Sequence, residues 1–168
     1  MTNRAGDFEK PFWRYAIVTV PVILGLGMLS GWVSNSGYGN DWFDALRKPS
    51  IMPPGWVFGA AWTALYIFLG LALALILQAR GARGRNIALG LFAAQMLLNY
   101  SWSPVFFGMH LIAPALFIIV LMLSLSIAAS FIFVRIRQPA AWLMMPYLAW
   151  LAFASMLNYR ILELNPGA

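Results

Sequence analysis

The sequence predicts an all-α integral membrane protein, built as a bundle of five transmembrane helices with a long first loop. Apolar residues make up 62% of the 168 residues and charged residues only 10%, whereas a soluble domain carries about 45–50% apolar and about 25% charged residues. A soluble protein of this length could not bury so much apolar surface. The apolar residues also form continuous runs of about 20 residues, the length that crosses the hydrocarbon core of a bilayer.

The five predicted spans cover residues 12–33, 56–77, 87–107, 111–134 and 140–162. Glycine, proline and charged residues fill the breaks between them, and such residues typically end helices. The runs are continuous rather than alternating in polarity, which favours helices over the strands of a membrane barrel. The first run is too long for the apolar region of a signal peptide, so we interpret it as a helix of the mature protein. The spans fill almost the whole chain, which predicts one domain over residues 1–168.

The basic residues predict the orientation of the bundle. With five spans, the N-terminus and the second and fourth connections lie on one side of the membrane, and basic residues concentrate on the cytoplasmic side. The N-terminus is therefore predicted to be cytoplasmic and the C-terminus extracytoplasmic. The same rule accounts for the net charge of +6 without a nucleic-acid partner. The basic side carries Arg4, Lys10, Arg14, Arg80, Arg83, Arg85, Arg135 and Arg137, and the opposite side carries Arg47, Lys48 and Arg160.

The first connection is the only long one, and long loops in compact proteins are often functional. Its segment NDWFDALRK is predicted to form one or two helical turns, with Asn40 as the N-cap and an i,i+4 pair between Asp44 and Lys48. We interpret this segment as a lid over the extracytoplasmic mouth of the bundle. An interfacial helix anchored by its aromatic residues is the alternative.

The residues needed for common enzymatic chemistry are missing from the sequence. There are no cysteines, which excludes disulfides, thiolate metal sites and thiol catalysis. There is no Ser/His/Asp set, pair of carboxylates or phosphate-binding loop, and no ionisable residue lies deep in a span, as an ion-coupled pump would require. His110, the single histidine, lies in a tight turn and is interpreted as a loop residue rather than a haem ligand. No metal and no tightly bound cofactor are expected.

The third predicted span contains the stretch LLNYSWSPVFFG, in which polar residues and a proline interrupt an apolar run. Asn99 cannot face lipid cheaply, because its amide needs partners that lipid lacks. Pro104 has no N–H and leaves the carbonyl of Tyr100 free, which predicts a kink and a free acceptor. At helical spacing the inward stripe consists of Gln95, Asn99, Trp102 and Phe106.

The second and fifth predicted spans carry similar combinations of proline and aromatic residues. Pro53 and Pro54 come just before the second span, as a preset helix start. Its aromatic residues are Trp56 at the mouth, then Phe58, Trp62 and Tyr66. One side of the fifth span carries Pro146, Trp150, Ala154, Leu157 and Asn158. Converging aromatic residues with a few amides predict a cavity for a flat, mostly apolar ligand. In the alternative interpretation, the tryptophans lie at the membrane interface for solvation and the asparagines only join helices.

Two pairs of small residues have the spacing of helix–helix contacts in membranes. They are Gly27–Gly31 in the first span and Gly90–Ala94 in the third. Either pair is a candidate dimer face.

Three stretches, KPSIMPPGWVFGAAWTALY, AAQMLLNYSWSPVFFG and PYLAWLAFASMLNY, resemble the translocator protein family (TspO/MBR), which includes the bacterial tryptophan-rich sensory proteins and the peripheral-type benzodiazepine receptor. The resemblance implies a five-helix bundle, usually a homodimer, that binds tetrapyrroles such as protoporphyrin IX and haem. It also implies binding of cholesterol and of synthetic benzodiazepine-type ligands. The implied ligand-binding residues are Trp42, Trp56, Phe58, Trp62, Asn99, Trp102, Trp150, Ala154 and Leu157, with the first loop as a cover. From charge alone, Arg47 or Lys48 is predicted to face the porphyrin carboxylates.

The sequence departs from the family pattern at two places. Ile51 stands where many members have a tryptophan before the Pro-Pro pair. At the end of the fifth span, Arg160 follows Tyr159 directly and Glu163 stands where a basic residue is expected, so high-affinity sterol binding is not expected. Three functions remain open: a membrane receptor or sensor for tetrapyrroles, a porphyrin transporter, and a light-dependent porphyrin-degrading enzyme. In the last case Trp56 and Trp150 would be the reactive residues.

Overall fold

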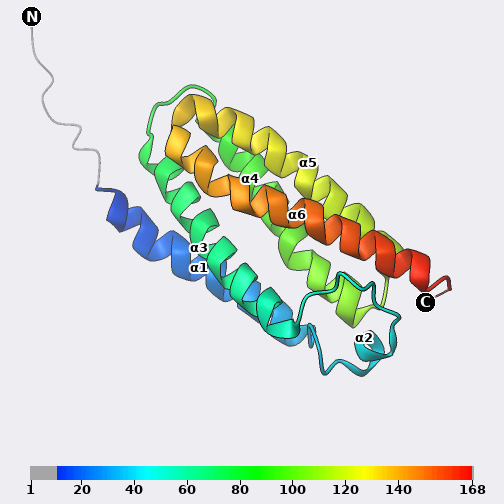
Figure 1. Ribbon diagram of the computed structural model, residues 1–168. Helices are drawn as coiled ribbons and strands as arrows, with labels where there is room; N and C mark the ends of the chain where they lie inside the picture. Colours follow the sequence, from blue (N-terminus) through cyan, green and yellow to red (C-terminus); the bar gives the residue numbers. More distant parts are fainter. Residues whose placement is uncertain (1–10, 168) are drawn as a thin grey trace, which may run out of the picture.

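The computed structural model describes residues 11–167, and every regular element in this range is helical (Figure 1). The long helices are α1 (Phe12–Val33), α3 (Gly55–Gln78), α4 (Arg85–Ser103), α5 (Ile112–Ile136) and α6 (Gln138–Leu164). The short helix α2 (Asp41–Ala45) lies in the first loop, and the π-helical turn η1 (Pro104–Gly108) continues α4. The predicted all-α class and the long first loop are confirmed. Arg4 and Lys10, which contributed to the predicted orientation, lie outside the described residues.

Four helices of the described chain are long and apolar enough to cross a bilayer. They are α1, α3, α5 and α6, with mean hydropathies of 2.0, 2.2, 2.7 and 1.5 over their most apolar windows. α4 has 19 residues but is not among them. Its polar residues include Gln95 and Asn99, which are only 0% and 5% exposed and therefore face the protein interior. Helix length and hydropathy thus support four of the five predicted spans.

The long helices form a ring around a common core. α1 packs mainly on α3, α3 also packs on α6, α6 packs on α5, and α5 packs on α4; a smaller contact between α4 and α1 closes the ring. The tightest crossing joins α1 to α3. There the Thr19 hydroxyl donates to the Gly70 carbonyl at 2.7 Å, and a Cβ on Gly70 would lie only 2.6 Å from the Val20 Cα. Only glycine allows this approach.

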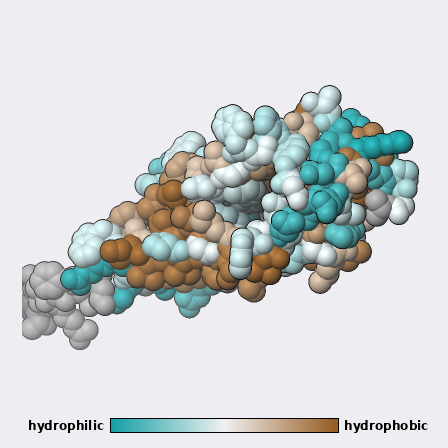
Figure 2. Space-filling view, turned by 90° about the horizontal axis from the view of Figure 1, so that it is seen from below, coloured by the Kyte–Doolittle hydropathy of each residue, from teal (hydrophilic) through white to brown (hydrophobic). Residues whose placement is uncertain are grey.

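Apolar side chains cover both the interior and much of the outer surface. Leu69, Met144 and Tyr147 are completely buried in the core, whereas Ile17, with 66% of its area exposed, points outward from α1. Figure 2 shows apolar surface over a large part of one face, next to a more polar end. Such an exterior fits a lipid environment, in which outward apolar side chains cost nothing.

The connections at the arginine-rich end are short and fixed by backbone contacts. Gly84 has a φ of +82° at the start of α4. The Arg85 guanidinium donates to the carbonyls of Ile76 and Leu77, both at 3.0 Å, and so satisfies the C-terminus of α3. Arg137 alone separates α5 from α6.

The first loop carries the predicted helical segment, with one correction. Asn40 caps α2, since its Oδ1 accepts from the Phe43 N–H at 3.0 Å. The predicted side-chain pair between Asp44 and Lys48 is wrong. The Lys48 ammonium donates to the backbone carbonyls of Phe43 at 2.6 Å and of Asp44 at 3.1 Å, while the Asp44 carboxylate accepts from the Gly39 N–H at 2.9 Å. Lys48 is thus the C-terminal cap of a short helix, a position that favours a cation.

Candidate functional site

A cavity of about 440 Å³ lies among the helices, toward the end of the bundle that carries the first loop. Its walls come mainly from α1, α3, α4, α6 and the loop. Figure 2 shows a hollow near the centre of one face, between apolar surface and the polar end. The volume is within the range of about 300–1,000 Å³ that is typical of small-molecule sites. No described lining residue carries a charged side chain, so the cavity suits an uncharged part of a ligand.

A buried chain of hydrogen bonds forms one side of the cavity. The Tyr66 hydroxyl donates to Asn99 Oδ1 at 2.8 Å, and Asn99 Nδ2 donates to the Tyr147 hydroxyl at 3.0 Å. The Tyr147 hydroxyl in turn donates to Gln95 Oε1 at 2.7 Å. The chain connects α3, α4 and α6 and leaves both ends of the Asn99 amide satisfied. Asn99 therefore joins helices in addition to lining the cavity.

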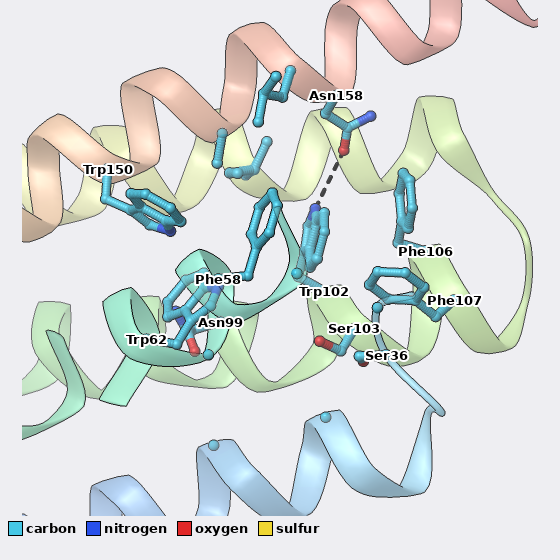
Figure 3. A pocket seen from close by; sticks show the side chains of 18 of the residues that line it. Ser36, Phe58, Trp62, Asn99, Trp102, Ser103, Phe106, Phe107, Trp150 and Asn158 are labelled. Carbon is cyan, nitrogen blue, oxygen red and sulfur yellow. Dashed lines mark hydrogen bonds between the residues drawn. The ribbon is translucent and has the colours of Figure 1, made fainter. Parts of the chain in front are cut away.

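Asn158 has the same double role at the loop end of the cavity. Its Oδ1 accepts from the Trp102 indole N–H at 3.3 Å, and its Nδ2 donates to the Ile112 carbonyl at 3.0 Å (Figure 3). The predicted inward position of both asparagines is confirmed. Because the oxygen and the nitrogen of each amide already have a partner within the protein, neither asparagine depends on a ligand to satisfy it.

Aromatic rings make up most of the remaining wall. Trp62 and Trp150 lie 6.5 Å apart between ring centroids at 85°, and Phe58 lies 5.7 Å from Trp150 at 75°. Trp62 also lies 5.3 Å from Tyr66. The Trp150 indole nitrogen is buried and has no hydrogen-bond partner, although a buried N–H is normally paired. The wall thus offers flat apolar surface, and the unsatisfied indole donor is buried rather than exposed to the cavity.

The π-helical turn η1 results from Pro104. Pro104 has no N–H to donate to the Tyr100 carbonyl, and this carbonyl accepts from the Ser30 hydroxyl of α1 at 2.6 Å. The turn also brings two successive side chains inside, since Phe106 and Phe107 are 1% and 8% exposed. The sequence predicted only Phe106, because a regular α-helix would place its neighbour on another face.

The first loop closes one end of the cavity with Phe43 rather than with Trp42. The Phe43 ring lies 5.1 Å from Phe107 and 6.1 Å from Phe106. Trp42 packs against the same cluster without lining the cavity. Its ring lies 5.5 Å from Phe106 and stacks on His110 at 4.4 Å and 14°. His110 is a loop residue, as predicted, with a φ of +60°.

Seven of the nine residues expected at the ligand site line the cavity: Phe58, Trp62, Asn99, Trp102, Trp150, Ala154 and Leu157. Trp42 and Trp56 do not. Trp56 is 75% exposed, because two residues of α-helix turn it about 200° away from Phe58.

Pro146 was predicted on the same side as Trp150 but is exposed. Because an α-helix has 3.6 residues per turn, residues spaced four apart rotate gradually around the helix axis. Pro146, at the end of the series, therefore no longer faces the interior.

The contribution of α1 to the site was not predicted. Gly27, Met28 and Gly31 of α1 line the cavity. A Cβ on Gly27 would overlap the Tyr66 ring, so Gly27 serves a contact between α1 and α3 inside the bundle. The spacing of Gly27 and Gly31 indicated close helix packing, which the structure has at Gly27. Spacing alone does not identify the partner helix.

The fold and the site define an α-helical membrane protein with an uncharged, aromatic-walled cavity between its helices. A sequence model of the TspO/MBR family matches residues 17–164, and the chain belongs to that family. It is 38% identical to the tryptophan-rich protein TspO of Chlorobaculum tepidum over 154 residues, which cover 89% of this chain and 98% of the relative. It is 39% identical over 126 residues to the tryptophan-rich sensory protein of Cereibacter sphaeroides, covering 75% and 78%. The human translocator protein is 37% identical over 133 residues, covering 78% and 79%. Family membership and the apolar helices together establish an integral membrane protein.

Proposed function

We propose that this chain is a membrane receptor or sensor that binds tetrapyrroles, protoporphyrin IX or haem, in the cavity described above. The observation that carries the proposal is a neutral cavity walled by aromatic rings. A flat conjugated macrocycle gains from stacking and edge contacts with such rings. The described lining residues include no histidine or cysteine, and the proposal assigns recognition to contacts with the ring system.

The proposed receptor crosses the membrane five times, with α4 as the fifth span. α4 lies between α5 and α1 in the ring of helices, and its polar side chains that face inward lower its hydropathy without contacting lipid. The N-terminus is proposed to be cytoplasmic, because basic residues concentrate on the cytoplasmic side of a membrane. One end of the bundle carries the connection with Arg80, Arg83 and Arg85 and also the turn at Arg137 (Figure 1). A homodimer remains the expected assembly from the family resemblance.

The proposal is tested by titrating the detergent-purified protein with protoporphyrin IX and following the quenching of tryptophan fluorescence. Ala154→Phe fills part of the cavity and is expected to weaken binding by about tenfold or more, equivalent to about 1.4 kcal/mol. Trp150→Phe replaces the indole with a smaller ring and reduces the aromatic contact area, and a loss of about three- to tenfold is expected. The matched controls are Ala152→Phe and Trp142→Phe, at exposed positions of the same helix. Equal losses in variants and controls, or no binding by the unaltered protein, contradict the proposal.

A light-dependent porphyrin-degrading activity is the second candidate, favoured by the Trp62–Trp150 pair in the cavity wall. Indoles close to a bound photosensitiser are placed to exchange electrons with it, whereas the exposed Trp56 is not. Illumination of the porphyrin complex in air should then give a bilin-like product that Trp62→Phe and Trp150→Phe reduce and Trp56→Phe leaves unchanged. A porphyrin transporter is separated from both by flux into proteoliposomes; the absence of charged residues from the described cavity lining favours binding over ion-coupled transport.

A further inference from the structure

We propose that the polar end of the ligand binds to the hydroxyls of Ser36 and Ser103, a subsite at the edge of the cavity that faces α1. The proposal rests on the proposed function and adds the class of ligand group that this subsite takes: a hydrogen-bond acceptor, above all a carboxylate, carried by an otherwise apolar molecule. Ser36 follows α1 in the first loop, and Ser103 ends α4. Both residues line the cavity (Figure 3).

The other polar side chains of the cavity lining are used within the protein, which leaves few groups for a ligand. The Tyr38 hydroxyl donates to the Pro53 carbonyl at 3.2 Å, and the Thr63 hydroxyl donates to the Gly59 carbonyl at 2.8 Å. Tyr66, Asn99, Trp102 and Asn158 take part in the bonds described above. Among the described lining residues, the groups without a partner are the Trp62 and Trp150 indoles and the two serine hydroxyls. The indoles belong to the apolar wall, so the serines are the free hydroxyl donors.

The fold holds the two serines in the same corner of the cavity. The Ser36 N–H donates to the Gly31 carbonyl at 3.0 Å, and the Ser36 Oγ lies 3.9 Å from the position of a Cβ on Gly31. Ser30, the neighbour of Gly31, bonds the Tyr100 carbonyl at 2.6 Å, and Ser103 lies one turn further along the chain from Tyr100. Figure 3 shows both side chains on the side of the cavity toward α1. A Ser103 hydroxyl bonded to the carbonyl four residues earlier would be unavailable, but no such bond forms, in contrast to Ser126 and Ser130.

This corner is also where the polar group of a membrane-dissolved molecule would lie. α1 ends at Val33, and Ser36 is exposed in the polar loop that follows. A ligand with its ring system among the tryptophans would therefore keep its polar end at the edge of the apolar region, where hydration is retained. Lys48, one of the two basic residues expected to face the carboxylates, donates its ammonium to three backbone carbonyls. Neither Lys48 nor Arg47 lines the cavity. The proposal therefore places the ligand carboxylates at the two serines rather than at these basic residues.

The test compares protoporphyrin IX with its dimethyl ester, which has the same ring but no carboxylates, on the full chain in detergent. The double variant Ser36→Ala/Ser103→Ala should lose about tenfold in affinity for the free acid, because hydrogen bonds to a charged acceptor are roughly twice as strong as neutral ones. It should lose no more than about threefold for the ester. The matched control is Ser101→Ala, on the same helix, whose hydroxyl donates to the Leu98 carbonyl at 2.8 Å and is absent from the cavity lining.

Binding of the ester also reports whether the double variant is folded. Ser36→Thr/Ser103→Thr keeps both hydroxyls and should restore binding of the free acid to within about threefold of the unaltered protein. If the unaltered protein binds neither porphyrin, the proposed function fails. If it binds both and the double variant retains full affinity for the free acid, or loses acid and ester equally, the serine subsite is refuted while the proposed function stands.

Discussion

Replacing Asn99 with leucine removes a side chain of similar size that joins three helices through hydrogen bonds. The amide accepts from Tyr66 at 2.8 Å and donates to Tyr147 at 3.0 Å. Hydrogen bonds between membrane helices contribute on average about 0.6 kcal/mol and at most about 1.7 kcal/mol. Loss of both bonds should therefore lower the free energy of unfolding by about 1–3 kcal/mol. Of the two tyrosines, Tyr66 is left without an acceptor, whereas Tyr147 still donates to Gln95.

The assay is an SDS titration of the detergent-solubilised protein, with helix content followed by circular dichroism. Asn86→Leu, at an exposed position of the same helix, is the control and should have little effect. A double-mutant cycle with Tyr66→Phe isolates the bond itself, because the double variant leaves no unpaired hydroxyl or amide oxygen from that bond. We expect a coupling energy of about 0.5–1.5 kcal/mol, as for other side chains in one network. Strictly additive effects of Asn99→Leu and Tyr66→Phe would refute the inference that this network holds the helices together.

Three further predictions follow from contacts around the cavity. Gly27→Ala should lower the melting temperature because its methyl group would overlap the Tyr66 ring, whereas Gly25→Ala, with no atom within 4 Å of the new Cβ, should not; a stable Gly27→Ala protein would contradict the close packing. Lys48→Gln should speed proteolysis of the first loop through loss of the α2 cap, and Arg47→Gln should leave the cleavage rate unchanged; equal rates in both variants would remove Lys48 from that role. Porphyrin affinity should change less than about twofold between low and high salt, because no described lining residue is charged and screening acts on charge pairs; a steep salt dependence measured by fluorescence titration would point to a cationic site.

The positions and inward faces of the helices were predictable because they depend on local rules. Continuous apolar runs locate the helices, and the cost of an unpaired amide in lipid predicts that Asn99 and Asn158 face inward. The lack of a bond from Pro104 to the Tyr100 carbonyl followed directly from the missing N–H of Pro104. The N-cap of α2 followed from Asn40 alone.

The parts of the site that were missed depend on contacts between distant segments. The wall contributed by α1 could not be predicted from the sequence, because Gly27 has no side chain that indicates a site. Its role depends on its contact with the Tyr66 ring of α3. Trp56, expected at the mouth and included in the ligand set through the family resemblance, is exposed and does not line the cavity. Trp42 was expected at the ligand site, whereas Phe43 of the same short helix lines the cavity and Trp42 packs on Phe106 and His110.

Pro104 also has a consequence for how the chain assembles. Because Pro104 cannot donate to the Tyr100 carbonyl of α4, this carbonyl accepts from the Ser30 hydroxyl of α1. The bond joins residues 70 positions apart in the sequence. During synthesis α1 reaches the membrane first, and the Ser30 hydroxyl then has only the backbone of its own helix as a partner. The permanent partner arrives with α4, so this contact between the first and third long helices is made late, after the hairpin of α1 and α3 already exists.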